Sequence, residues 1–127
     1  MAVFIHFLNG NNRELEDHYF IKGYRNDVVV EIDTIFYEVY FFTKDSLEYE
    51  MRKDGFFSLP GIVILDEITL NKIVASVNYL LSVHFFDVFK GYSRESILNG
   101  NFSNRWYVGQ TAKFTFESAS SFELGNG

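Results

Sequence analysis

The chain has 127 residues, 47% of them hydrophobic and 19% aromatic, with a net charge of −6 and no cysteine. This length fits one domain, and this much apolar surface excludes disorder for most of the chain. The negative charge disfavours nucleic-acid binding, and the lack of cysteine excludes disulfides and cysteine-ligated zinc. The acidity belongs to residues 1–70, which hold 13 acidic and six basic side chains, against four and five in residues 71–127.

The N-terminal residues predict a strand over 3–8, because this stretch is mostly apolar and is followed by a turn-rich asparagine and glycine segment. It lacks the basic segment and the small-residue cleavage site of a signal peptide. With no export signal and no cysteine, we expect the protein in the cytoplasm, without a membrane segment.

Residues 13–22 allow two interpretations. Asn12 could cap a short helix, whereas the His-Tyr-Phe-Ile run near the end of the segment favours a strand. The β-forming run tips the balance, so we predict a strand over 17–22 and a loop over 23–26.

Residues 28–32 and 35–43 predict a β-hairpin closed by a two-residue turn at Asp33 and Thr34. Because side chains alternate along a strand, one face of this hairpin collects aliphatic residues and is expected to be buried. The predicted register pairs Ile32 with Ile35, Val30 with Tyr37, and Val28 with Val39.

The other face of this hairpin mixes carboxylates with large aromatic rings. We interpret it as a candidate surface for a cationic protein partner, with aromatic anchors ringed by polar groups. The alternative is that a second layer, such as a later helix, covers the aromatics and leaves the acids at the rim. The candidate partner-binding residues on this face and just beyond it are Glu31, Asp33, Phe36, Glu38, Tyr40, Phe42, Glu48 and Glu50.

A short helix is predicted over 46–53. Asp45 and Glu48 have the spacing of a capping box, and Gly55 can end the helix. Alternation of apolar and acidic residues over 47–51 would also fit a strand, but the cap and the glycine favour the helix.

The best-defined unit of the chain is a strand followed by a helix. A turn at Pro60 and Gly61 precedes a predicted strand over 62–66. Thr69 is a good N-cap for the main helix over 70–83, whose apolar residues recur at helical spacing.

Beyond the main helix, two alternatives stay open: the helix continues to Lys90, or the chain breaks into a strand over 85–89. A single helical turn is predicted within 93–100, and a last hairpin within 106–116.

The serine- and glycine-rich residues 118–127 are predicted to fray, apart from an anchor at Phe122. The remaining residues, 1–117, are predicted to form a single α+β domain. This domain would have a mostly antiparallel sheet with one main helix and one or two short helices packed on it.

No motif in the chain indicates catalysis, a cofactor or a metal. The three histidines are His6, His18 and His84, and a lone histidine at such positions is usually a packed or surface residue. We therefore expect no enzyme activity, no cofactor and no metal. The enzyme alternative would need His18 or His84 beside a carboxylate in an enclosed cleft.

The middle of the chain resembles small bacterial immunity proteins, the cognate inhibitors of polymorphic toxins, including contact-dependent growth inhibition systems. The resemblance lies in residues 35–43 and 55–65, followed by the helix that begins at Thr69. It implies a cytoplasmic, non-enzymatic protein that binds one basic toxin domain 1:1, often a nuclease. The acidic charge would then imitate phosphates and speed association.

A different class of function also fits the composition. So many phenylalanine and tyrosine residues could line a pocket for a small ligand, with a few convergent polar groups. Such a binding module would respond to small molecules and not to a protein partner.

Overall fold

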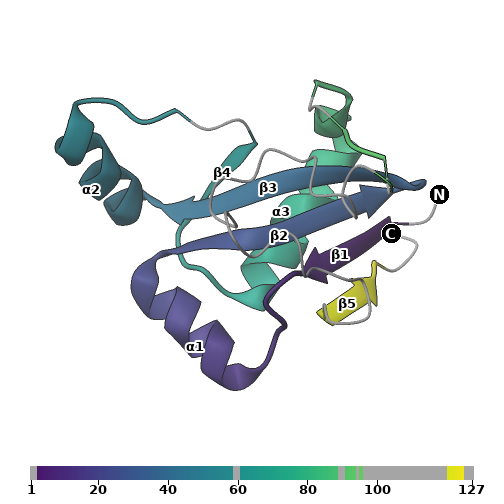
Figure 1. Cartoon of the computed structure of the whole chain (residues 1–127), viewed down its shortest axis with the longest axis horizontal. Helices are drawn as coiled ribbons and strands as arrows, with labels where there is room; N and C mark the ends of the chain where they lie inside the picture. Colours follow the sequence, from purple (N-terminus) through teal and green to yellow (C-terminus); the bar gives the residue numbers. More distant parts are fainter. Residues whose placement is uncertain (1–2, 59–60, 89–90, 94, 96–119, 125–127) are drawn as a thin grey trace.

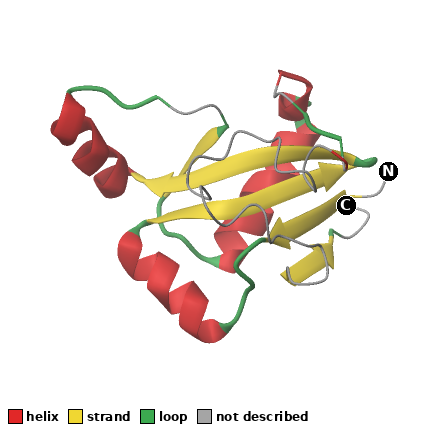
Figure 2. Cartoon of the chain, viewed as in Figure 1, coloured by secondary structure: helices red, strands yellow, loops and turns green. Residues whose placement is uncertain are grey.

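The computed structural model describes residues 3–58, 61–88, 91–93, 95 and 120–124. Its strands are β1 (Val3–Phe7), β2 (Tyr24–Ile32), β3 (Ile35–Thr43), β4 (Ile62–Leu65) and β5 (Ser120–Glu123). Its helices are α1 (Arg13–Lys22), α2 (Lys44–Asp54), α3 (Leu70–Ser82) and the 3-10 turn η1 (Phe85–Val88). The strands form one sheet in the order β4-β3-β2-β1-β5. Helix α3 lies across one face of the sheet, and α1 and α2 extend from one end (Figure 1 and Figure 2).

The predicted α+β class is confirmed, but the sheet is mixed. The β1–β2, β1–β5 and β2–β3 pairs are antiparallel, whereas β4 runs parallel to β3. The prediction of a mostly antiparallel sheet therefore needs correction at β4. A long connection containing α2 joins β3 to β4, which lets the chain return and run in the same direction.

The predicted hairpin is confirmed together with its register. Ile32 lies opposite Ile35 and Val28 lies opposite Val39, as the alternation of side chains required. Asp33 and Thr34 both have positive φ angles, 48° and 71°, so the turn has the type I′ geometry that matches the twist of the strands.

Both faces of the hairpin are buried. On one face, Ile73, Val77 and Leu80 of α3 belong to the same core cluster as the aliphatic residues of β1, β2 and β3. On the opposite face, Val29 and Phe36 form a second cluster. Helix α3 therefore covers the aliphatic face, and the idea that it covers the aromatic face is wrong.

Residues 13–22 form α1, so the predicted strand over 17–22 is wrong. The Asn12 side chain caps the helix by accepting a 2.9 Å hydrogen bond from the Leu15 amide. Gly23 ends the helix in the left-handed region. These two capping residues outweigh the β-forming run between them.

Strand β2 begins immediately after α1, at Tyr24, so the predicted loop over 23–26 is wrong. The register between β2 and β3 shifts between Arg25 and Val28, where β2 carries one extra residue. Such a β-bulge bends the strand and lets a polar segment stay within the sheet.

Helix α2 confirms the helical interpretation, although it begins two residues earlier than the predicted 46–53 and ends one residue later. The Thr43 hydroxyl, and not the Asp45 carboxylate, accepts the capping hydrogen bond from the Ser46 amide. Gly55 ends the helix as predicted. None of the residues of α2 is buried, and the helix stands away from the core (Figure 1).

Helix α3 begins after Thr69 as predicted, and the Thr69 hydroxyl accepts a 3.3 Å hydrogen bond from the Lys72 amide. Glu16 of α1 accepts a second bond, 3.0 Å, from the Leu70 amide, which ties the two helices together. After α3 the chain forms η1, so neither a longer helix nor a strand follows. His84, at a φ of 57°, marks the change of direction.

Residues 120–123 form the edge strand β5, so the predicted fraying of 118–127 is wrong for this part. Strand β5 pairs with β1, and the predicted anchor Phe122 lies opposite Ile5. A terminal segment stays ordered when a neighbouring strand satisfies its backbone groups, and the local composition does not reveal that neighbour.

The strands predicted over 3–8 and 62–66 are confirmed as β1 and β4, each one residue shorter. The turn predicted within 93–100 lies largely outside the described residues, and the hairpin predicted within 106–116 lies wholly outside them. Among the helices of the described part, none has the length and apolar character needed to cross a membrane.

Candidate functional site

The aromatic residues predicted as contact anchors on the hairpin are buried. Phe36, Tyr40 and Phe42 are only 0%, 2% and 1% exposed. The Phe42 ring packs against the rings of Tyr24 and Phe57, with centroid distances of 5.7 and 5.3 Å. These three side chains are therefore not exposed as contact anchors in this structure, although α3, the helix suggested as their cover, packs on the opposite face.

Two acidic residues of the same face interact with side chains of the sheet. The Glu31 carboxylate lies 2.8 Å from Nε2 of His6, and the Glu38 carboxylate accepts a hydrogen bond from the Tyr40 hydroxyl. Asp33 lies at the exposed tip of the hairpin. These interactions give Glu31 and Glu38 a structural role within the sheet.

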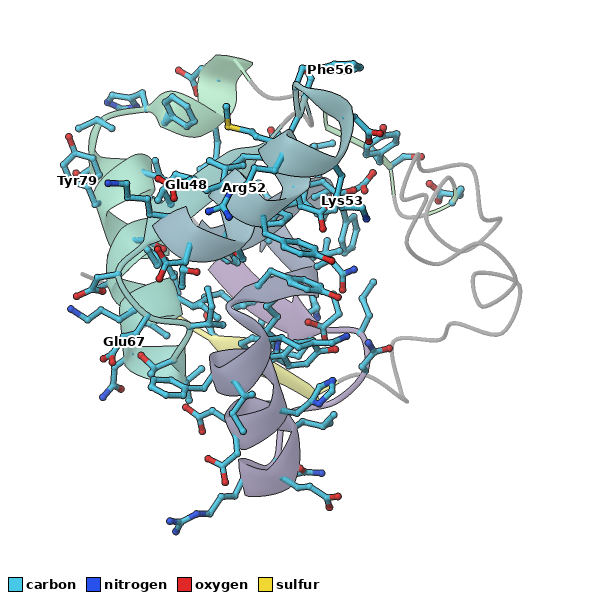
Figure 3. The ribbon with its side chains drawn as sticks, turned by 90° about the vertical axis from the view of Figure 1, so that its left-hand side faces the viewer. Glu48, Arg52, Lys53, Phe56, Glu67 and Tyr79 are labelled. Carbon is cyan, nitrogen blue, oxygen red and sulfur yellow. The ribbon has the colours of Figure 1, made fainter. Side chains whose placement is uncertain are left out.

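The remaining two predicted residues, Glu48 and Glu50, lie on α2. Glu48 contacts Lys44 and Arg52 at 3.9 and 3.8 Å and lies on the exposed side of the helix (Figure 3). Asp33 lies at the other end of β3, a nine-residue strand of about 30 Å. The structure thus spreads the eight predicted residues from the hairpin tip, along β3, to α2.

A groove at the α1–α2 end of the sheet combines exposed apolar side chains with acids. It has a volume of about 560 Å³ and opens between the end of α1, the start of α2 and the turn before α3. We call it the acidic–aromatic groove. Its charged lining residues are Lys22, Asp45, Glu50, Asp66 and Glu67. Its large apolar lining residues are Phe20, Ile21, Tyr24 and Tyr49.

The apolar side chains of this groove face solvent. Phe20 is 50% exposed, Tyr49 is 62% exposed and Ile21 is 83% exposed. Exposed aromatic residues next to carboxylates are typical of protein-binding surfaces, where rings supply contact area at a low entropy cost. The combination of exposed aromatic rings and carboxylates, which was predicted for the hairpin, is therefore found at this end of the sheet.

Gly23 holds the walls of the acidic–aromatic groove together. Its carbonyl accepts hydrogen bonds from the Thr43 amide at 2.8 Å and from the Ser46 hydroxyl at 2.5 Å. Its own amide donates to the Tyr19 carbonyl at 3.0 Å. One glycine thus connects α1, β3 and α2, which fixes the position of α2 although that helix buries no residue of its own.

Replacing Gly23 with alanine is expected to lower the free energy of unfolding by about 2 to 4 kcal/mol. Gly23 has a φ of 77°, and an added Cβ would lie 2.9 Å from Oγ1 of Thr43. Gly55 is the matched control, because its φ of 81° is similar but an added Cβ meets nothing within 4 Å. Gly55→Ala should cost only about 1 kcal/mol. Equal urea midpoints for the two variants would contradict this role of Gly23.

Two carboxylates of the groove are not neutralised. Within the described residues, the Asp45 and Glu67 side chains make no ion pair or hydrogen bond. Glu50 lies 3.7 Å from Lys53, and Lys22 places its ammonium 4.9 Å from the centroid of the Tyr24 ring. The groove therefore has a net negative charge with two carboxylates available to a cationic partner.

Lys72 lowers the pKa of Asp66. Lys72 donates a 3.2 Å hydrogen bond to the Asp66 carboxylate, and this bond is the main reason that the pKa of Asp66 lies below its usual value. A depressed pKa adds stability above the pKa of the unfolded state, and this stability is lost as the pH falls through the folded-state pKa.

Replacing Lys72 with methionine is expected to raise the pKa of Asp66 toward the usual aspartate range, because the hydrogen bond and the positive charge are both removed. Titration of the Asp66 side-chain carboxyl carbon by NMR measures this change directly. An unchanged midpoint in the variant would show that Lys72 does not control Asp66.

Sequence reasoning missed Phe20, Ile21 and Tyr49 as surface residues. The first two were assigned to a strand, whereas the Asn12 cap was the signal for the helix that exposes them. Asp66 and Glu67 precede the N-terminus of α3, where acids commonly complement the helix dipole, so their position alone does not indicate a groove. The groove becomes visible only when these separate segments meet.

The histidines do not form an open catalytic site. His6 is 6% exposed and lies between the rings of Phe4 and Phe36, with centroid distances of 6.1 and 5.9 Å. His18 and His84 are exposed. In the part of the chain that the structure describes, no three His, Asp or Glu side chains are grouped to hold a metal ion.

Comparison with known proteins identifies no similar protein. The chain matches no family model, no curated protein and no solved structure.

Proposed function

We propose that the protein is an immunity protein that binds a basic bacterial toxin domain in the cytoplasm and blocks it through the acidic–aromatic groove. The observation that carries this proposal is the combination, in one groove, of four carboxylates and exposed aromatic side chains. This location replaces the hairpin face, whose aromatic residues are buried.

Charge favours a cationic partner. Four carboxylates line the groove against the single ammonium of Lys22, and the whole chain carries a net charge of −6. Such a field attracts a basic domain and raises the rate of productive encounters. The active site of a nuclease is basic because it binds phosphates, so carboxylates in the groove would compete with its substrate.

Exposed rings favour a protein over a small molecule. Phe20 and Tyr49 can pack on a partner, and cationic side chains of that partner can lie over their rings. A small-ligand site normally encloses most of its ligand, whereas this groove is open to solvent. The small-ligand alternative would be supported by thermal stabilisation with small molecules in the absence of a protein partner.

Co-expression tests the proposal. The product of the adjacent upstream open reading frame is the candidate toxin, and the protein should restore growth to cells that express it. The two proteins should also purify as a 1:1 complex whose dissociation constant rises with salt. Lack of rescue together with lack of a complex would refute the immunity function.

A further inference from the structure

Strand β4 forms an open edge of the sheet. It lies at one end of the strand order, and β3 is its one neighbour among the described strands (Figure 1). Proteins usually protect an edge strand with a charged residue, a proline or a covering element, because its free backbone groups can pair with another strand. The opposite edge strand, β5, carries Glu123, whereas β4 consists of four uncharged aliphatic residues.

The register identifies the free backbone groups of β4. The Tyr40 amide donates a 2.9 Å hydrogen bond to the Gly61 carbonyl, and Tyr40 lies beside Ile62 in a parallel pair. In a parallel ladder every second residue bonds to the same neighbour, so Gly61 and Val63 are among the residues that bond to β3. The N–H and C=O groups of Ile62 and Ile64 therefore point away from β3. Within the described residues, no other segment bonds to these groups.

The edge is accessible and firmly held. Ile64 is 49% exposed, whereas Leu65 belongs to the main core cluster and Val63 packs against it. Packing thus fixes the strand on the α3 side of the sheet and leaves its outer edge free. Outward N–H and C=O groups at every second residue are complemented by one kind of partner, an extended strand with the same spacing.

We propose that an extended segment of a basic partner protein adds to β4 as a further strand of the sheet. This inference rests on the proposed function, with the toxin domain as the partner. Strand β4 leads directly into Asp66 and Glu67, which line the acidic–aromatic groove, so the edge and the groove form one continuous surface. A cationic residue at the end of the added strand can pair with Glu67, whose side chain makes no ion pair within the described residues.

Charge favours a basic partner over a second copy of this chain. Two copies that each carry a net charge of −6 repel one another, and each β4 edge would bring its own two acids to the contact. A basic segment is attracted instead. Pairing along four residues alone covers too little surface for a stable complex, so the groove has to supply the rest of the contact.

Amide hydrogen exchange followed by NMR tests the proposal. The full chain is measured alone and in complex with the product of the adjacent upstream open reading frame. In the free chain the Ile64 amide should exchange quickly and the Val63 amide slowly, because only the Val63 amide donates to β3. In the complex, exchange of the Ile64 amide should slow at least about tenfold, because this amide donates to the added strand. Slowing confined to residues 20–24 and 43–50 would overturn the added strand.

Substitutions of Ile64 separate its backbone from its side chain. Ile64→Pro removes the outward N–H without removing a hydrogen bond to β3, and should weaken the complex at least about tenfold. Ile64→Val keeps the N–H and a β-branched side chain, so this control should bind within about threefold of the wild type. Ile64→Lys is a second variant that keeps the backbone intact. It should weaken the complex as well, because its charge repels a basic segment.

The outcomes distinguish this inference from the immunity function. Urea unfolding and far-UV circular dichroism check that each variant is folded. A complex that rescues growth without protecting the Ile64 amide would overturn the added strand and leave the immunity function intact. So would a complex that tolerates both Ile64→Pro and Ile64→Lys. Absence of any complex would overturn both proposals. Protection of the Ile64 amide by self-association of the free chain would overturn the choice of partner.

Discussion

Replacing Asp45 and Glu67 with asparagine and glutamine is expected to slow association with the toxin domain by about tenfold or more at low ionic strength. Both carboxylates line the acidic–aromatic groove and make no ion pair among the described residues, so a cationic partner can pair with them. Stopped-flow measurement of the association rate over a range of salt concentrations should show a shallower salt dependence for the variant.

The matched control removes the same charge elsewhere. Glu14→Gln with Asp87→Asn also changes the net charge from −6 to −4, but both residues are exposed and lie outside the groove. At physiological ionic strength within this salt series, the control should lose only a small part of the association rate, because exposed charges beyond a Debye length of about 8 Å are screened there. Equal losses in the two double variants would mean that net charge alone, and not the groove, attracts the partner.

A third variant set separates the groove from the hairpin. Neutralising Glu31, Asp33 and Glu38 removes the three acids that the sequence pattern favoured. Because Glu31 contacts His6 and Glu38 contacts Tyr40, we expect this set to lower stability more than association. If it slows association more than the groove variant does, the hairpin face is the binding surface and the groove is not.

The hairpin could be predicted from the sequence because its information is local. Alternating side chains over 28–32 and 35–43 define two faces, and a two-residue turn fixes the register. The same holds for α3, whose Thr69 cap and helical spacing are both short-range signals. Burial of both faces of the hairpin was harder to predict from the sequence, because it depends on elements far away in the chain.

The sequence could not predict the neighbours of β4 and β5 in the sheet. Strand β4 joins β3 in parallel, and β5 joins β1 across more than a hundred residues of chain. Neither segment carries a local signal for its partner, because backbone hydrogen bonds do not depend on side-chain identity. The final serine-rich segment therefore looked like a fraying end.

The acidic–aromatic groove could not be predicted from the sequence either, because separate segments form it. Its walls come from 20–24, 43–50 and 66–67, and no segment alone combines the acids with the exposed rings. Assigning 17–22 to a strand removed one wall from consideration. The composition correctly indicated that some aromatic residues face solvent, but only the packing decides which ones do.

Arg25→Ala is expected to lower the free energy of unfolding by about 3 to 5 kcal/mol, the largest effect of any single substitution considered. Arg25 is 1% exposed and Asp27 is 0% exposed, and their side chains pair with Nε–Oδ1 and Nη2–Oδ2 distances of 2.7 and 3.2 Å. The guanidinium also donates to the Gly10 carbonyl at 2.9 Å. It lies 4.3 and 4.5 Å from the ring centroids of Phe7 and Tyr19. Removing it leaves a buried carboxylate without a cation.

A double-mutant cycle distinguishes this buried pair from simple loss of packing. Asp27→Ala alone should also be strongly destabilising, whereas Arg25→Ala with Asp27→Ala should cost at least about 1 kcal/mol less than the sum of the single variants. Arg52→Ala is the exposed control and should change stability by no more than about 0.5 kcal/mol. Additive losses in urea unfolding would show that the two charges do not depend on each other. Because the guanidinium contacts Tyr19 of α1 and β2 carries it, a coupled pair would explain how α1, and with it one wall of the groove, is fixed to the sheet.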